Sequence, residues 1–177
     1  MATEFAFLNP GPVTASLVVG EDGSSKSELG NSKGLGNQTD LELLLWFRSR
    51  SQIVLTSGAT AEADNYKYPA NTELAILSRA KRNFPRLTPD LNKVRFLQGQ
   101  TISDAIKALQ HQGFTEIHTE FGETGFLELS SGVVDCYLSS KSADGIEAFL
   151  ERTGLVASER FSLPDLEIAR VVGRGRN

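Results

Sequence analysis

Residues 117–139 constrain the fold of this chain more than any other stretch. An apolar run ends at Glu120, a turn with Gly122 and Gly125 follows, and a helical segment then leads into a second apolar run through Tyr137. A strand, a glycine turn and a helix start often hold a phosphate, because the exposed amides and the positive end of the helix dipole face the anion. An ordinary strand-to-helix connection has the same pattern. The sequence therefore predicts the strand–helix–strand unit but does not decide whether its turn binds an anion.

The composition excludes several classes of protein. With 177 residues and 40% hydrophobic content, the chain can bury one sizeable core, so a single domain is expected. A net charge of −4 argues against a nucleic-acid-binding protein, and no apolar stretch approaches the length of a membrane span. The single cysteine, Cys136, excludes an internal disulfide and fits a reducing cytoplasm, where we expect the protein to act. One cysteine and two distant histidines do not suggest a metal site.

Apolar periodicity divides the chain into alternating strands and helices. We expect strands at residues 13–19, 53–55, 74–77, 94–97 and, once or twice, within 161–172, and helices at 41–48, 101–110 and 145–151. This alternation predicts an α/β domain of three layers with a mostly parallel central sheet. The domain should span residues 13–172, between a lead-in at residues 1–12 and a frayed tail at residues 173–177.

A long polar stretch, residues 20–40, separates the first strand from the first helix. A loop of this length inside a compact domain has a function or is disordered, and its Gly, Ser and Asn content favours a flexible insertion. Asp40 is expected to cap the helix that follows, and Leu44, Leu45 and Phe47 are expected in the core.

Polar clusters follow two of the predicted strands. Residues 57–60 (Ser-Gly-Ala-Thr) come after one strand, and Ser78 and Arg79 come after the next. Ligands of open α/β sheets bind beyond the carboxyl ends of the strands. A hydroxyl with a guanidinium can hold a phosphate monoester, which arginine can grip bidentately. Thr60 can equally be a helix cap, and the cations after Ser78 can equally form a basic loop that balances an acidic protein.

The turn in residues 120–125 resembles a motif of the pyrimidine reductases of riboflavin biosynthesis, which have the dihydrofolate-reductase-like fold. That family has a glutamate-glycine-glycine-proline turn followed by a valine-aspartate pair. Glu120, Gly122 and residues 134–135 match this motif, whereas Phe121 replaces the first glycine and Glu123 the proline. Together with two further matches, the resemblance covers most of the chain and implies this fold.

The second match follows the second predicted strand. Here the family has glycine-alanine-glycine-threonine and then an alanine and a tyrosine at fixed spacing. Residues 57–60, Ala63 and Tyr66 hold these places, with Ser57 and Ala59 instead of the first and third glycines. In the family this turn holds cofactor phosphates through amides and the threonine hydroxyl, which corresponds to Thr60.

The third match lies in the long polar stretch. Asp22 and Gly23 match the end of an alanine-serine-leucine-aspartate-glycine run that leaves the family's first strand. Ser32, Gly34 and Asp40 fall in the register of a glycine- and serine-rich loop that closes the family's substrate pocket. The arginine that often follows the aspartate of that loop is absent here.

The resemblance implies an NADPH-dependent reductase. The residues that would contact the cofactor are Ser57, Gly58, Ala59, Thr60, Ser78, Arg79, Glu120, Phe121, Gly122, Glu123 and Thr124. Among them, Ser78 and Arg79 would contact the 2′-phosphate, the group that distinguishes NADP from NAD. The substrate would contact Gly23, Ser32, Gly34, Asp40 and Arg48. Asp22 is the candidate for orienting the substrate or delivering a proton, although Asp22–Gly23 is also good turn chemistry.

The closest substrate class is a ribosylamino-pyrimidine phosphate, to which the family transfers hydride from the nicotinamide. Two alternatives stay open: a reductase of another carbonyl, imine or pterin-like compound on the same fold, and a drifted, non-catalytic relative that binds a nucleotide or nothing. Family members are typically homodimers. The apolar strand from Val133 to Leu138, together with the final strands, is the expected dimer face.

Overall fold

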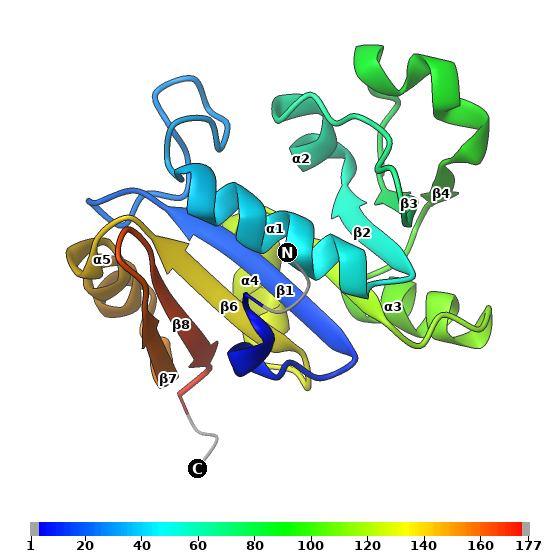
Figure 1. Ribbon diagram of the computed structural model, residues 1–177. Helices are drawn as coiled ribbons and strands as arrows, with labels where there is room; N and C mark the ends of the chain where they lie inside the picture. Colours follow the sequence, from blue (N-terminus) through cyan, green and yellow to red (C-terminus); the bar gives the residue numbers. More distant parts are fainter. Residues whose placement is uncertain (1–3, 175–177) are drawn as a thin grey trace.

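One eight-stranded sheet forms the centre of the molecule (Figure 1). The computed structural model describes residues 4–174. The strands lie in the order β4-β3-β2-β5-β1-β6-β8-β7. Their bounds are β1 (Val13–Val19), β2 (Ile53–Ser57), β3 (Glu73–Leu77), β4 (Arg95–Leu97), β5 (Ile117–Glu120), β6 (Asp135–Ser140), β7 (Val156–Ser162) and β8 (Glu167–Val172). The six from β4 to β6 are parallel, and β8 and β7 continue the sheet antiparallel.

Helices cover both faces of this sheet. They are α1 (Gln38–Arg50), α2 (Gly58–Ala63), α3 (Ile102–His111), α4 (Glu123–Ser130) and α5 (Ala143–Thr153), with 3-10 turns η1 (Ala6–Leu8) and η2 (Pro85–Lys93). In Figure 1, α1 crosses the front of the sheet, whereas α3, α4 and α5 lie behind it. The predicted three-layer α/β domain with a mostly parallel sheet is confirmed.

The side chains of β6 alternate between two of the hydrophobic cores, one on each face of the sheet. Cys136 and Leu138 pack with α3, α4 and α5, while Tyr137 between them packs with α1. Successive side chains of a strand point to opposite faces, so a sheet covered on both sides buries both sets. Among the fully buried side chains, Phe126 and Phe149 are the largest of the first core, and Tyr137, Phe5 and Phe47 are the largest of the second.

Several element boundaries differ from those predicted. α1 begins at Gln38, and its cap is Asn37, whose side chain accepts a hydrogen bond from the Asp40 amide at 2.9 Å. The prediction that Asp40 caps this helix is therefore wrong, because an asparagine three residues earlier takes that role. Leu45 is 46% exposed rather than in the core, and Leu43 is buried in its place.

The strand β6 also begins later than predicted. It starts at Asp135, and Val133 is 94% exposed in the turn before it. β6 is hydrogen-bonded to β1 on one side and to β8 on the other. Both edges of β6 are therefore occupied within the chain, and the predicted homodimer stays a prediction.

The lead-in packs onto the domain. Phe5 and Leu8 are buried against α1 and β8, and the Gly11 amide donates to the Asp135 carboxylate at 2.7 Å. At the other end, the Gly173 amide donates to the Ser130 carbonyl at 3.1 Å, and the rest of the predicted tail, from residue 175, lies outside the described residues. No described helix is long and apolar enough to cross a membrane.

A histidine lies in the middle of the sheet, on the side covered by α1. His118 is fully buried, and its two ring nitrogens lie 2.8 Å and 3.0 Å from the hydroxyls of Thr14 and Ser16. The Phe47 ring stacks on the imidazole, with 4.9 Å between the two ring centroids. Burial is the main influence on this imidazole and lowers its pKa from the usual 6.5 to about 4. The folded protein therefore holds His118 neutral across the range where the unfolded chain would protonate it.

We predict that the free energy of unfolding falls as the pH drops from 7 to 5. Protons bind His118 in the unfolded chain below pH 6.5 but in the folded protein only near pH 4, so acid favours unfolding. The loss from this one residue should be on the order of 2 kcal/mol at pH 5.

Urea denaturation at several pH values would measure this loss. His118→Gln should be less stable at neutral pH but should lose less stability on acidification, whereas the control His111→Gln should keep the parental slope. Equal pH slopes in the parent and His118→Gln would contradict this account.

Candidate functional site

A cleft of about 1030 Å³ lies at the carboxyl ends of the parallel strands. The loop after β1, the starts of α2 and α4, the end of β3 and the segment before α3 form its walls. Twelve of the residues selected from the sequence line it: Asp22, Ser32, Ser57, Gly58, Ala59, Thr60, Ser78, Arg79, Phe121, Gly122, Glu123 and Thr124. Segments separated by up to about a hundred residues along the chain thus converge at the edge where such sheets bind ligands.

The turn after β5 opens the amino end of α4 to this cleft. Gly122 is the residue before the helix, and no side chain caps the helix at this end. A Cβ at position 122 would meet only the Thr60 hydroxyl, at 3.8 Å, so the space beside the glycine is open. The amides of the first helical turn and the positive end of the dipole therefore have room for an anion.

Phe121, which replaces a glycine of the family, points into the core. It is 6% exposed, and a Cβ at Gly125 would come within 2.6 Å of its Cβ. The absence of a side chain at Gly125 is what lets the Phe121 ring pack against α4. The ring thus does not obstruct the open side of the turn at Gly122.

A second close approach joins α2 to the end of β3. A Cβ on Gly58 would lie 2.5 Å from the Ser78 hydroxyl, so only glycine allows Ser78 to come this near. Ser57 caps α2 by accepting from the Thr60 amide at 3.0 Å, and it donates its own hydroxyl proton to the Thr60 hydroxyl. The reading of Thr60 as the helix cap is therefore wrong, because Ser57 occupies that position.

Arg79 provides positive charge at the rim beside Ser78. Its side chain is exposed and, among residues 4–174, it makes no ion pair. Arg82, also in the cleft wall, is instead paired with Glu62 at 2.6 Å. Of these two neighbouring arginines, Arg79 is the one whose guanidinium is available to a phosphate.

Glu123 puts a carboxylate at the mouth of the same turn. Arg152 of α5 pairs with it, and the Ser25 hydroxyl donates to it at 2.7 Å. The hydrogen bond from Arg152 is the main cause that lowers the pKa of Glu123. Arg152 also donates to the Gly23 carbonyl at 3.0 Å, so this cation neutralises Glu123 and ties the loop after β1 to α4.

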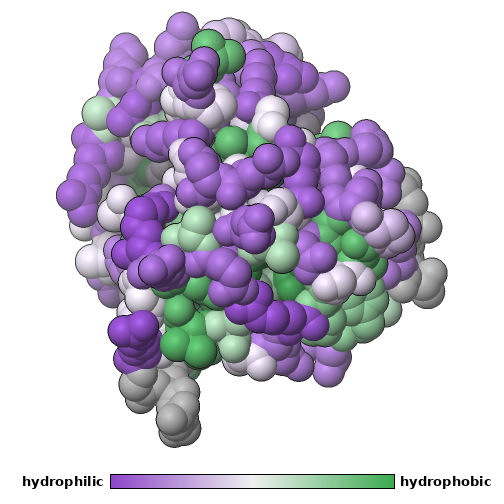
Figure 2. Space-filling model, turned by 90° about the vertical axis from the view of Figure 1, so that its left-hand side faces the viewer, coloured by the Kyte–Doolittle hydropathy of each residue, from purple (hydrophilic) through white to green (hydrophobic). Residues whose placement is uncertain are grey.

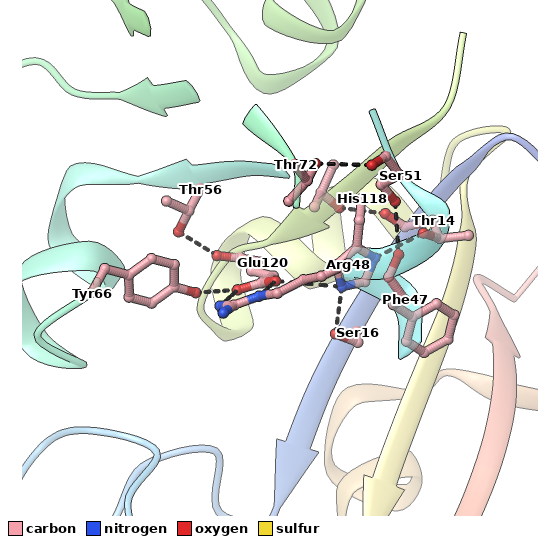
Figure 3. Close-up of polar contacts among 11 residues, drawn as sticks. Thr14, Ser16, Phe47, Arg48, Ser51, Thr56, Tyr66, Thr72, His118 and Glu120 are labelled. Atoms are coloured by element: carbon pink, nitrogen blue, oxygen red, sulfur yellow. Dashed lines mark hydrogen bonds and ion pairs between the residues drawn. The ribbon is translucent and has the colours of Figure 1, made fainter. Parts of the chain in front are cut away.

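Glu120 lies just behind the cleft in a buried polar network (Figure 3). Arg48 donates to its two carboxylate oxygens at 2.7 Å and 2.6 Å, and the Tyr66 hydroxyl donates to the second of them. Burial is the largest influence on Glu120 and opposes its ionisation, but the Arg48 guanidinium outweighs it, so the pKa of Glu120 is lowered. These partners occupy the carboxylate, and Glu120 and Arg48 do not line the cleft.

Three other selected residues, Asp22, Ser32 and Asp40, have structural partners. Asp22 lines the cleft while its carboxylate accepts from the Ser24 amide at 2.9 Å, as in a turn. The Ser32 hydroxyl donates to Asp64 at 2.9 Å. Asp40 lies away from the cleft lining, its pKa is raised by burial, and it accepts a hydrogen bond from Ser139 at 2.6 Å.

Gly23 and Gly34 also lie outside the cleft lining. Both have left-handed backbones, with φ of +75° and +83°, which suit glycine. Gly23 is packed so closely on α5 that a Cβ would come 2.7 Å from the Phe149 amide nitrogen. These two glycines thus shape the loop rather than present side chains to a ligand.

Sequence reasoning missed several polar residues of the cleft, among them Arg152 and Gln100. Arg152 reads in the sequence as an ordinary basic residue in the last turn of a helix. Gln100 stands directly before Thr101, the cap of α3, and after an edge strand. Its position beyond a strand end is the one signal that could have singled it out.

Several proteins of known structure share this fold at low sequence identity. No protein-family model and no curated protein sequence matches the chain. A pyrimidine reductase-like protein from Corynebacterium diphtheriae is similar in structure, with a TM-score of 0.66 and 18% identity over 97% of this chain and 95% of that one. A dihydrofolate reductase from Enterococcus faecalis, solved with NADP(H), has a TM-score of 0.57 and 12% identity over 91% of this chain and 97% of that one. The chain has the dihydrofolate-reductase-like fold.

The fold resemblance extends to a longer, bifunctional deaminase/reductase. The diaminohydroxyphosphoribosylaminopyrimidine deaminase/5-amino-6-(5-phosphoribosylamino)uracil reductase of Thermotoga maritima has a TM-score of 0.66 and 15% identity over 96% of this chain. The present chain covers 58% of that protein. The resemblance to pyrimidine reductases predicted from three motifs is thus confirmed at the level of fold.

We predict that Glu120→Ala destabilises the fold strongly. The substitution leaves the partly buried Arg48 guanidinium and Tyr66 hydroxyl without their acceptor, which should cost about 3 kcal/mol, the lower end of the range for buried pairs. Chemical denaturation would measure it. The control Glu62→Ala removes the partner of an exposed arginine and should leave the free energy of unfolding close to the parental value. Similar stabilities for the two variants would show that the buried network is not a main support of this region.

Proposed function

We propose that this protein is an NADPH-dependent reductase. One observation carries the proposal: the uncapped start of α4 and the pair Ser78–Arg79 line the same cleft at the carboxyl ends of the sheet. The first suits a diphosphate and the second a phosphate monoester, which are the two anionic groups of NADPH. The Enterococcus faecalis dihydrofolate reductase, a relative in fold, was solved with NADP(H), which supports the same assignment.

Each part of the cofactor has residues that suit it. The amides of residues 122–124 and the Thr60 hydroxyl would hold the diphosphate, with Arg152 neutralising the carboxylate of Glu123 beside it. Ser78 and Arg79 would hold the 2′-phosphate. When bound, NADPH supplies the hydride, and the protein's contribution is to hold the substrate against it and to exclude water.

Within this proposal, the substrate is a ribosylamino-pyrimidine phosphate, as in the reductases that share the fold. Lys26 supports it, because it lines the cleft and makes no ion pair with another residue in the described part of the chain. Asp22, in the same wall, is the group that would orient the substrate or deliver a proton. A cytoplasmic location belongs to the same proposal.

One observation favours a second candidate. The arginine that often follows the loop aspartate in the family is replaced by Leu41, which is 46% exposed, and Arg152 is already paired with Glu123. With fewer cations for a substrate phosphate, a reductase of an unphosphorylated carbonyl, imine or pterin-like compound is the alternative. Turnover of NADPH with a phosphorylated substrate and with its dephosphorylated form would separate the two.

We predict that NADPH binds more tightly than NADH and that Arg79→Ala removes most of the difference. A lost charge-assisted hydrogen bond costs about 1.5–3 kcal/mol, which corresponds to about 10- to 150-fold in affinity. Titration followed by nicotinamide fluorescence would measure both cofactors. Lys81→Ala is the matched control, because Lys81 is exposed but does not line the cleft. Equal affinities of the parent for NADPH and NADH would remove the basis for assigning the 2′-phosphate to Arg79.

We also propose that the protein forms a homodimer, now through the edge strand β7 rather than β6. β7 has a partner only on its β8 side among the described residues, and Val156 on it is 46% exposed. On the face shown in Figure 2, hydrophobic residues gather toward the lower end while the upper part is mostly hydrophilic. Light scattering should give a dimer mass at micromolar concentration, and Val156→Lys should shift it toward monomer. A monomer in the parent would exclude this assembly.

A further inference from the structure

One buried polar atom in the cleft lacks a partner. Among the side chains of residues 4–174, the Oε1 atom of Gln100 is the buried oxygen or nitrogen that makes no hydrogen bond. Native proteins pair nearly all such atoms, and an exception calls for a physical explanation. Because Gln100 lines the same cleft as the proposed cofactor residues, a bound ligand is a natural partner for this oxygen.

The surroundings of Gln100 favour a flat ring. Leu77 and Ile102 line the cleft together with it and supply apolar surface. Gln100 lies three residues beyond β4, whose last residue, Leu97, pairs with Leu77 and accepts a hydrogen bond from the Ser78 amide at 3.1 Å. The amide side chain of Gln100 is therefore on the segment that continues from the proposed 2′-phosphate site.

We propose that Gln100 recognises the adenine base of the dinucleotide, an inference that rests on the proposed function. A glutamine side chain offers one carbonyl acceptor and an NH₂ donor side by side. The edge of adenine presents the complementary pair, an exocyclic amino group that donates and a ring nitrogen that accepts, and glutamine binds this edge bidentately. The N6 amino group thereby supplies the donor that Oε1 lacks, while the ring rests on Leu77 and Ile102.

This assignment makes Gln100 a specificity residue. On the edge formed by N6 and N7, hypoxanthine carries a carbonyl oxygen where adenine carries the N6 amino group. Its N7 also accepts, so this edge offers no donor to Oε1 in either orientation of the glutamine amide. The cleft should therefore prefer a dinucleotide with adenine over the same dinucleotide with hypoxanthine. No other part of the proposed site distinguishes the two, because they carry the same phosphates and the same nicotinamide.

The test uses calorimetric titration of the full-length protein with three probes: NADPH, its hypoxanthine analogue, and adenosine 2′,5′-bisphosphate. The last contains the base with the 2′- and 5′-phosphates but no nicotinamide, so it reports on the adenosine end of the site. Gln100→Leu removes the amide but keeps a side chain of similar size. Gln98→Leu is the matched control, because Gln98 is exposed and does not line the cleft.

We expect Gln100→Leu to weaken the binding of adenosine 2′,5′-bisphosphate by about 5- to 150-fold, the range for losing a bidentate contact to a base. The preference of the parent for NADPH over its hypoxanthine analogue should disappear in Gln100→Leu and persist in Gln98→Leu. If the parent binds NADPH but Gln100→Leu binds every probe as the parent does, Gln100 does not read the base, while the reductase proposal stands. If the parent binds none of the probes, both proposals are overturned.

Discussion

An ion pair between Arg48 and the buried Glu120 holds the last residue of β5 in place, and the turn that opens into the cleft begins one residue later. Arg48 comes from α1 and Tyr66 from the segment after α2, and both donate to the same carboxylate. The Thr56 hydroxyl of β2 also donates to the Glu120 carbonyl, at 2.6 Å. Four separate segments are thereby joined one residue before the turn that opens into the cleft. Positioning by a fully satisfied buried network is rigid, because any displacement would leave a charge without its partner.

A second ion pair, between Arg152 and Glu123, determines which charges face the cleft. Glu123 would repel a diphosphate at the start of α4 if its charge were free, but Arg152 and Ser25 already bind it. The exposed cations that remain in the wall without an ion pair among the described residues are Arg79 and Lys26. The helix dipole and these two side chains give the cleft the character of an anion site, although the chain as a whole is acidic.

The fold could be predicted from the sequence because its signals are local and repeated. Short apolar runs ending in glycine or serine, separated by helical spacing, are enough to indicate a parallel sheet, and β1 has the predicted bounds. The start of α1 was missed because Asn37 and Asp40 are both good caps, and only the tertiary contact of Asp40 with Ser139 decides between them. β7 begins at Val156, before residue 161, where the final strands were predicted to start, because an exposed edge strand has no apolar periodicity.

Much of the candidate site could also be predicted, since glycine turns after strands are visible in a sequence and twelve selected residues meet in one cleft. The side chains with which these residues pair could not be predicted. Nothing local indicates that Arg152 neutralises Glu123 or that Arg48 binds Glu120, because each pair joins elements that only the complete fold brings together. The orphaned oxygen of Gln100 is likewise a property of packing, and it has no counterpart in a sequence pattern.

The substitution Gly122→Val tests the central claim, that the turn after β5 holds an anionic part of a dinucleotide, most directly. Position 122 has an ordinary φ of −66°, and the nearest atom to an added Cβ is 3.8 Å away, so the variant should melt close to the parent. Its side chain would instead fill the space in front of the α4 amides, so NADPH titration should show affinity reduced by about 10-fold or more, the effect of losing charged hydrogen bonds. A Gly122→Val variant that is folded and binds NADPH as tightly as the parent would contradict the account.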